Sequence, residues 1–342
     1  MNMHTYPIAA LKAKLLAGGT VALSEKVSSQ YPMFRDNHHQ NPWIFLSLSS
    51  TSRVRLTVAH ENPFFLLDMN ETDCLFIVEL ATNKIVAEKL IFEEAIIHAP
   101  DQLFLGIYEY CRVGCKFCPC SIRQEKIHYS LDSIYEDISN AQGKPFSNVG
   151  ITTSIPPHLS PDDVADEMIF IVKKIREKLG SQIPLGVSTK IPTKEKLILL
   201  KEAGADEIRL NVEIPNAELA LKLMPQKPLH DILESIEMAC QVFGTGKVSS
   251  NIVIGLGESD DDVLCYIEML AKMGAIATLY PYDPIETCDS DIKTLKRPTA
   301  ERLLGLAIEH KKILDKHCLD TAGLLTMCPA CAASHILPGR DL

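Results

Sequence analysis

Between residue 103 and about residue 317, short apolar runs alternate six times with longer stretches that have one apolar face. The short runs predict strands at 103–108, 149–153, 184–189, 207–212, 248–254 and 276–280. The longer stretches predict helices at 131–140, 160–179, 193–204, 230–243, 259–274 and 299–317. Because parallel strands need long crossover connections, the alternation predicts a parallel sheet. Six units do not fill an eight-unit barrel, so we expect an α/β partial barrel at residues 101–317.

The first hundred residues follow a different plan. Residues 7–17 are helical in pattern. Runs rich in β-branched and aromatic residues follow at 43–48, 53–58, 64–69, 75–80 and 85–90. The segment Arg53-Val-Arg-Leu-Thr-Val58 alternates as a half-buried strand does, and Asn83-Lys84 could turn a hairpin. We therefore expect a small α+β module with an antiparallel sheet at residues 1–100.

Three cysteines lie on the loop after the first strand of the expected partial barrel, in the sequence Cys111-Arg-Val-Gly-Cys115-Lys-Phe-Cys118. In such folds the active site lies at the carboxyl ends of the strands, which is where this loop is expected. Three thiolates can hold three corners of a [4Fe–4S] cube, and the fourth iron then stays open to a small molecule. The loop could instead bind zinc with Cys120 as fourth ligand, but a zinc site predicts no six-unit barrel.

The cysteine loop, with Phe117 beside its third cysteine, and the units behind it resemble the radical SAM superfamily over roughly residues 100–317. The resemblance implies that Cys111, Cys115 and Cys118 hold a [4Fe–4S] cluster whose open iron binds S-adenosylmethionine (SAM). It also implies that the reduced cluster cleaves SAM and that the resulting 5′-deoxyadenosyl radical abstracts a hydrogen atom. The cofactors would perform this chemistry, and the protein would supply positioning and a dry cavity.

Contacts to SAM are expected at the ends of the later strands. The second strand ends in Gly150-Ile-Thr-Thr-Ser154, where the family often has Gly-Gly-Glu for the amino group of SAM. Thr153 and Ser154 offer hydroxyls but no carboxylate, so backbone carbonyls must supply part of this contact. Asn211 and Glu213 resemble the pair with which biotin and lipoyl synthases hold the ribose, and residues two apart on a strand share a face. They could also be ordinary polar strand ends.

The resemblance places three further residues near the adenine. Gly255 and Gly257 follow the fifth strand and resemble a glycine-containing segment of the family. The same glycines could simply shape a turn. Tyr280 ends the sixth strand and is expected close to the adenine or the substrate.

The tail at residues 318–342 contains a second group of cysteines, in Met327-Cys328-Pro-Ala-Cys331. Cys328 and Cys331 could be two ligands of a second iron–sulfur cluster, completed by Cys318, Cys288 or His335. They could also be two reduced thiols on a mobile tail.

Several reactions are compatible with these features. The segments at 211–215 and 253–259 look most like the biotin synthase, lipoyl synthase and hydrogenase-maturase group. In biotin and lipoyl synthases a second cluster is the sulfur donor, so a sulfur-inserting transferase is one expectation. The alternatives are a single-cluster mutase or cofactor-maturation enzyme, such as methylornithine synthase, and a non-catalytic iron–sulfur scaffold subunit.

Charge and composition limit the partners. The net charge is −10 over 342 residues and no basic run is present, which disfavours a nucleic-acid substrate. No apolar stretch of about 18 residues could span a bilayer, and the N-terminus lacks the pattern of a signal peptide. Eleven cysteines in such a chain indicate reduced thiols, so we expect a cytoplasmic, oxygen-sensitive protein. Its substrate would be a small molecule or a group on a carrier protein, and ferredoxin or flavodoxin could supply low-potential electrons.

Overall fold

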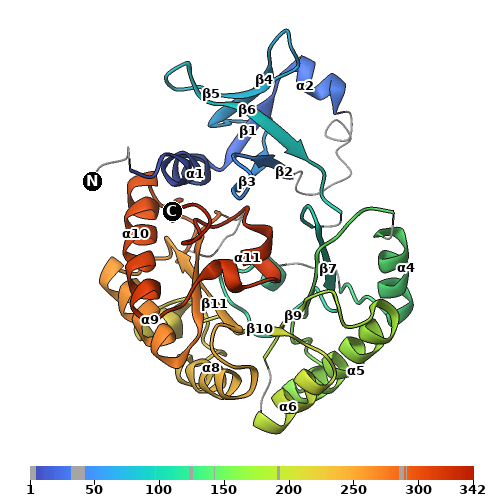
Figure 1. Cartoon of the computed structure of the whole chain (residues 1–342). Helices are drawn as coiled ribbons and strands as arrows, with labels where there is room; N and C mark the ends of the chain where they lie inside the picture. Colours follow the sequence, from blue (N-terminus) through green and yellow to red (C-terminus); the bar gives the residue numbers. More distant parts are fainter. Residues whose placement is uncertain are drawn as a thin grey trace.

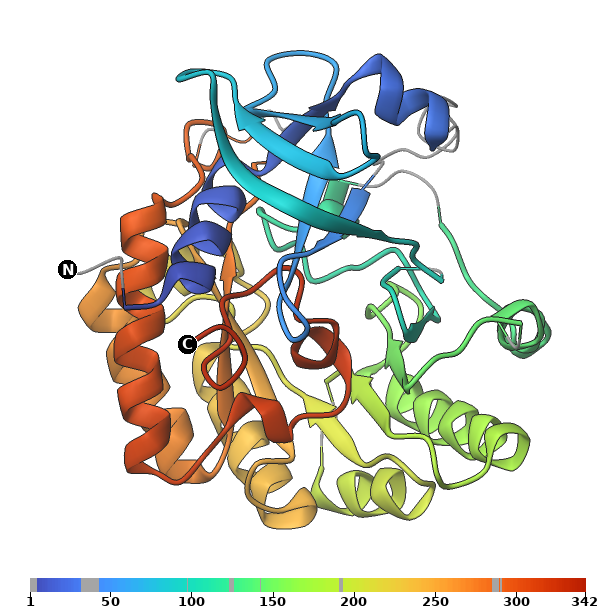
Figure 2. The ribbon, with the colours of Figure 1, turned by 45° about the horizontal axis from the view of Figure 1, so that its top comes forward.

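The structure is a computed structural model that describes residues 5–31, 43–96, 98–122, 126–141, 143–190, 193–284, 289 and 291–342. A small barrel built from the first six strands lies beside a parallel sheet built from the last six (Figures 1 and 2). Within the described residues, no helix has the length and apolar character needed to cross a membrane.

The later strands form the predicted parallel sheet, with neighbours in the order of the sequence. The strands are β7 (Gln102–Gly106), β8 (Asn148–Thr152), β9 (Leu185–Ser188), β10 (Glu207–Arg209), β11 (Val248–Ile254) and β12 (Ile276–Pro281). The helices that follow them are α4 (Leu131–Ala141), α5 (Pro161–Leu179), α6 (Lys194–Glu202), α8 (Leu229–Phe243), α9 (Asp260–Met273) and α10 (Ala300–Lys316). These helices form an arc around the outside of the sheet, which confirms the partial barrel (Figure 1).

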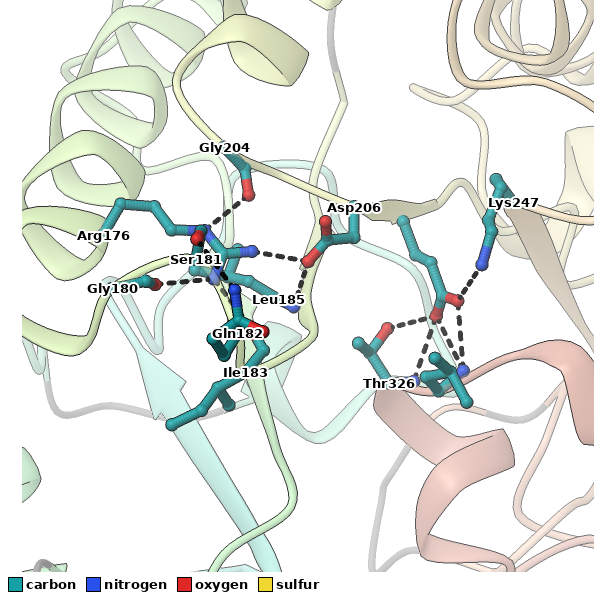
Figure 3. A network of polar contacts seen from close by, with 12 residues as sticks. Arg176, Gly180, Ser181, Gln182, Ile183, Leu185, Gly204, Asp206, Lys247 and Thr326 are labelled. Carbon is teal, nitrogen blue, oxygen red and sulfur yellow. Dashed lines mark hydrogen bonds and ion pairs between the residues drawn. The ribbon is translucent and has the colours of Figure 1, made fainter.

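Local sequence signals explain several of the helix starts. Ser160 caps α5: its side chain accepts a hydrogen bond from the backbone of Asp163, whose carboxylate accepts one from the backbone of Ser160. Ser259 and Asp262 form the same capping box at α9. At the other end of α5, Arg176 bonds the carbonyl oxygens of Gly204 and Ile183, which joins the helix to the segments around β9 (Figure 3). Local capping contacts thus fix these helix starts, and longer-range bonds such as those of Arg176 join the helices to the sheet.

The N-terminal strands close into a barrel in the order β1-β3-β2-β6-β5-β4. They are β1 (Thr20–Leu23), β2 (Trp43–Ser47), β3 (Arg53–Val58), β4 (Phe65–Met69), β5 (Leu75–Glu79) and β6 (Lys84–Glu93), preceded by α1 (Pro7–Gly18) and interrupted by α2 (Glu25–Gln30). The five predicted strands pair antiparallel, as expected. The sequence did not indicate β1, which is parallel to both β3 and β4 and closes the barrel.

The C-terminal tail fills the inner side of the parallel sheet. Its helix α11 (Met327–Cys331) lies inside the arc in Figure 1. A Cβ atom on Gly186 of β9 would overlap the side chain of Thr326, so the missing side chain lets the tail approach the sheet. The buried carboxylate of Glu207 accepts hydrogen bonds from the backbones of Leu325 and Thr326 and from the Thr326 hydroxyl (Figure 3).

Beyond α11 the tail connects the parallel sheet to the N-terminal module that contains the small barrel. The backbone N–H of Arg55 on β3 donates to the carbonyl of Ala333 at 2.9 Å. Lys12 on α1 is fully buried and donates to the carbonyl of Ala332 and to the carboxylate of Asp341 at 2.6 and 2.8 Å. A buried lysine needs such partners because burial penalises its charge. The tail therefore belongs to the packed interior.

Candidate active site

The cysteine loop follows β7 and is tied to the structure by its backbone. The N–H of Arg112 donates to the carbonyl of Ile155 beyond β8, and the N–H of Lys116 donates to that of Leu223, both at 2.9 Å. Leu223 ends α7 (Ala217–Leu223), a helix the sequence did not indicate. The Lys116 ammonium also lies 2.5 Å from the Asp291 carboxylate. These contacts hold the loop at the carboxyl edge of the sheet.

The thiols of this loop lie close enough to influence one another. Burial, together with the nearby Cys118, Glu213 and Cys111, raises the pKa of Cys115 to about 12. A hydrogen bond with Cys120 and burial raise the pKa of Cys118, and the same hydrogen bond lowers that of Cys120 to about 7. A coordinated metal would reverse this balance, because it deprotonates a bound thiol outright.

The donor set suits a cluster better than a single metal ion. Cys111, Cys115 and Cys118 are all partly buried and free of disulfides. In the part of the chain that the structure describes, no three Cys, His, Asp or Glu side chains converge on one metal position. A [4Fe–4S] cube requires no such convergence, since each thiolate binds a different iron. The three thiols therefore fit a cluster with one iron that the loop leaves open.

A cavity of about 1130 Å³ opens beside the cysteine loop. Phe117 and Cys118 of the loop, Asn211 and Glu213 after β10, and Tyr280 of β12 all line it. The small barrel and the tail contribute the remaining walls. These five sequence-predicted residues thus meet in one space large enough for a nucleoside-sized cofactor and a substrate.

Asn211 and Glu213 reach this cavity by an unexpected backbone path. The sequence predicted a strand through residue 212, but β10 ends at Arg209. Glu213 has a left-handed backbone with φ of 63°, and the N–H of Ile214 closes a tight turn onto the carbonyl of Val212 at 2.8 Å. A turn, not strand alternation, therefore directs Glu213, and such strain is typical of functional positions.

Comparison with known proteins decides the family. The model of the radical SAM superfamily matches residues 105–270, which run from β7 into α9 and include the cysteine loop. Residues 105–270 form a radical SAM domain. Members of this superfamily use a [4Fe–4S] cluster and SAM.

Two curated relatives match this chain over part of their length. The GTP 3′,8-cyclases of Aliarcobacter butzleri (strain RM4018) and Lactiplantibacillus plantarum (strain ATCC BAA-793 / NCIMB 8826 / WCFS1) are 27% and 26% identical over 181 and 193 residues. The matches cover 52% and 54% of this chain and 53% and 55% of the relatives. The chain thus spans about half the length of the curated relatives it matches.

A solved radical SAM structure supports the fold. The crystal structure of methylornithine synthase is 16% identical, with a TM-score of 0.53 over 68% of this chain and 69% of that chain. At this identity the likeness concerns the fold alone. The sequence was expected to group with biotin synthase, lipoyl synthase and the hydrogenase maturases, and the comparisons do not single out biotin or lipoyl synthase.

Four predicted cofactor-binding residues of the radical SAM domain lie outside the cavity lining, namely Thr153, Ser154, Gly255 and Gly257. The Thr153 hydroxyl donates to the carbonyl of Ser154. The two glycines have φ of 114° and 115° and shape a turn around Glu258, whose buried carboxylate accepts from the N–H groups of Gly255 and Leu256 at 2.7 and 2.8 Å. The alternative that the two glycines shape a turn is therefore confirmed, and their proximity to the adenine stays a prediction.

The tail brings Cys328 and Cys331 to the cavity that Cys118 also lines. The Cys328 sulfur accepts a hydrogen bond from Nη1 of Arg209 at 2.8 Å. Cys331 packs among Phe45 and Ala333, and burial raises its pKa to about 11. His335 also lines the cavity, whereas Cys318 is exposed and does not; Cys288 lies outside the described residues.

The sequence did not predict that two arginines would form a cationic wall of this cavity. Arg55 of β3 and Arg209 of β10 line it, with Trp43 and His98 beside them. The guanidinium of Arg55 lies 4.4 Å above the Trp43 ring and donates to the Tyr280 hydroxyl at 2.7 Å. The alternation of β3 gave no signal for Arg55, whereas Arg209, a buried arginine at the end of a parallel strand, was an available one.

Proposed function

We propose that this protein is an enzyme that holds a [4Fe–4S] cluster on Cys111, Cys115 and Cys118 and cleaves SAM reductively to act on a substrate in the cavity. When bound, the reduced cluster and SAM would supply a 5′-deoxyadenosyl radical that takes a hydrogen atom from an unreactive position. The observation that carries the proposal is the single cavity that joins the cysteine loop to Asn211 and Glu213.

The chain's own residues would position SAM and exclude water. The amide of Asn211 and the carboxylate of Glu213 can bond ribose hydroxyls, and Lys227 supports both: its ammonium donates to the Asn211 carbonyl at 2.9 Å and lies 3.9 Å from the Glu213 carboxylate. The small barrel and the tail wall the cavity, which protects a reactive intermediate from solvent. Thr153 and Ser154 would supply hydroxyl or carbonyl oxygens for the SAM amino group, and Tyr280 would contact the adenine or the substrate.

A second candidate is sulfur insertion with a second cluster on Cys328 and Cys331. The observation in its favour is that both cysteines line the same cavity as Cys118. Iron and sulfide analysis of anaerobic protein distinguishes the candidates. About eight irons per chain that fall to about four in the Cys328→Ala/Cys331→Ala variant would favour sulfur insertion. About four in both would exclude it and leave a single-cluster enzyme.

Formation of 5′-deoxyadenosine tests the main proposal. Anaerobic, reduced protein should release 5′-deoxyadenosine from SAM, and Cys115→Ala should abolish the release because it removes a cluster ligand. Cys240→Ala is the matched control, since that thiol lies on α8 away from the cavity. Absence of product from a wild-type protein that carries its cluster would favour a non-catalytic scaffold instead.

Each of the three segments of the chain would have its own role, and the enzyme would need an electron donor and a substrate. Residues 1–100 form the covering module, 101–317 hold the cofactors, and 318–342 complete the cavity. A low-potential donor such as ferredoxin or flavodoxin would deliver the electron, and the substrate would be a small molecule or a carrier-bound group. We place the enzyme in the cytoplasm and expect oxygen sensitivity, since the described cysteines are all free.

A further inference from the structure

Two arginines on the cavity wall form no ion pair within the described part of the chain. Arg209 is 8% exposed and donates to the Ser188 hydroxyl and the Cys328 sulfur. Arg55 contacts the Trp43 ring and the Tyr280 hydroxyl. Among the described residues, no carboxylate lies within ion-pair distance of either guanidinium. The charge of Asp283, which also lines the cavity, acts on Arg55 without forming an ion pair with it. A guanidinium removed from water without a paired carboxylate is costly, so this wall would stabilise an anion in the cavity.

Other arginines of the chain show the contrast. Arg297 lines the same cavity but is paired with the carboxylate of Asp283. Arg53, two residues before Arg55 on β3, is paired with both Glu93 and Asp101. Arg53 and Arg297 are thus ion-paired, whereas Arg55 and Arg209 line the cavity without a paired carboxylate among the described residues.

His335 adds an unpartnered donor to the same wall. It is fully buried, it lines the cavity, and neither ring nitrogen has a hydrogen-bond partner among the described residues. Burial and the charges of Lys12, Arg209 and Arg55 lower its pKa, so the ring is neutral and carries one N–H. Burial, Arg55 and Arg209 likewise lower the pKa of His98 to about 4. Both guanidiniums thus act on the same two imidazoles and lie around one region of the cavity.

We infer that Arg55, Arg209 and His335 form a binding site for an anionic group of the substrate, a phosphate or a carboxylate. The three side chains come from the small barrel, the parallel sheet and the tail. A guanidinium can offer two parallel N–H groups to such an anion, and the N–H of His335 can donate a further hydrogen bond to it. This inference rests on the proposed function, because the bound substrate is the one that the cluster end of the cavity would attack.

Calorimetric titration of the cluster-loaded, SAM-saturated protein at constant ionic strength tests the site. The probes are inorganic pyrophosphate and glutarate, and the tighter binder identifies the anion as phosphate or carboxylate. We expect one of them to bind the wild type and to perturb the fluorescence of Trp43, the only tryptophan of the chain. Arg55→Gln and Arg209→Gln should each weaken binding at least about tenfold, since a hydrogen bond to a charged group contributes about 1.5–3 kcal/mol. Arg176→Gln should change it less than about twofold, because Arg176 is paired with Asp206 outside the cavity lining.

Four results would overturn the inference. They are no binding of either probe to wild type, an equal loss in Arg176→Gln, competition between the probe and SAM, and eight irons per chain, which would place a second cluster on this wall. His335→Gln provides a variant that keeps both arginines, and it should weaken binding without removing it. The 5′-deoxyadenosine assay on the same wild-type preparation is read separately. SAM cleavage without anion binding contradicts the inference alone, whereas absence of cleavage contradicts the proposed function.

Discussion

Glu207, the first residue of β10, holds Thr326 of the tail against the inner side of the parallel sheet. The Thr326 hydroxyl and backbone N–H donate to one oxygen of the Glu207 carboxylate at 2.7 and 3.0 Å, and Lys247 lies 3.2 Å from the other oxygen (Figure 3). Glu207 is only 3% exposed, so these partners take the place of water around its carboxylate. Through this contact the tail is positioned to line the cavity next to the cysteine loop.

Replacement of Glu207 by alanine should therefore destabilise the whole chain. The variant leaves the donors of Leu325 and Thr326 without their acceptor, and we expect a loss of about 2–4 kcal/mol. Urea unfolding under anaerobic conditions measures it. The exposed Glu202 provides the control, since Glu202→Ala should change stability by less than about 0.5 kcal/mol. Equal effects of the two substitutions would contradict the role of Glu207.

A methyl group on Gly186 should push the tail away from the sheet. Its Cβ would overlap the Thr326 side chain, so Gly186→Ala is expected to cost about 1–3 kcal/mol. The tail should also become more sensitive to limited proteolysis. At Gly143 an added Cβ meets nothing within 4 Å, so Gly143→Ala should leave both unfolding and proteolysis unchanged. A wild-type proteolysis pattern in Gly186→Ala would show that the tail does not depend on this contact.

Local patterns in the sequence predicted most of the fold. The apolar run at 248–254 coincides with β11, and the capping signals at Ser160 and Ser259 mark real helix starts. These features depend on residues that are neighbours in the sequence. The four-residue strand β1 was missed because Thr20-Val-Ala-Leu23 is too short to show a period and derives its stability from pairing with β3 and β4.

The candidate site was only partly predictable for the same reason. The three cysteines of the loop lie close together in the sequence, so their spacing alone predicted three cluster ligands. The cationic wall depends on Arg55, Arg209 and His335, which come from three distant segments and meet only because the tail enters the sheet. Gly186 and Thr326 make that entry possible, yet neither residue signals it without the other.

His310 should make the protein less stable in mild acid. It is fully buried on α10, and burial lowers its pKa to about 3. The unfolded chain binds a proton below about pH 6.5 while the folded chain does not, so stability falls as pH drops from about 6.5 toward 3, by up to roughly 1.4 kcal/mol per unit. His310→Leu should reduce this slope in urea unfolding between pH 7 and 5. The exposed His60 is the control, and a slope unchanged in His310→Leu would contradict the assignment.

Glu213 should matter for SAM more than for folding. We expect Glu213→Gln to weaken SAM binding by about tenfold, because a neutral amide accepts weaker hydrogen bonds than a carboxylate does. Equilibrium dialysis with labelled SAM and the 5′-deoxyadenosine assay measure the effect, and thermal unfolding should change little. The exposed Glu218 lies nearby on α7, and Glu218→Gln should bind SAM as wild type does. Wild-type affinity in Glu213→Gln would remove Glu213 from the SAM site.

Electron paramagnetic resonance of the reduced, anaerobically prepared protein tests the central claim most directly. If Cys111, Cys115 and Cys118 hold a cluster with one open iron, the spectrum should show a reduced [4Fe–4S] cluster, and added SAM should change it. Cys118→Ala should lose both the signal and about four irons per chain, whereas Cys74→Ala, on the small barrel, should keep them. A cluster spectrum that SAM leaves unchanged, or bound zinc in place of iron, would contradict the account.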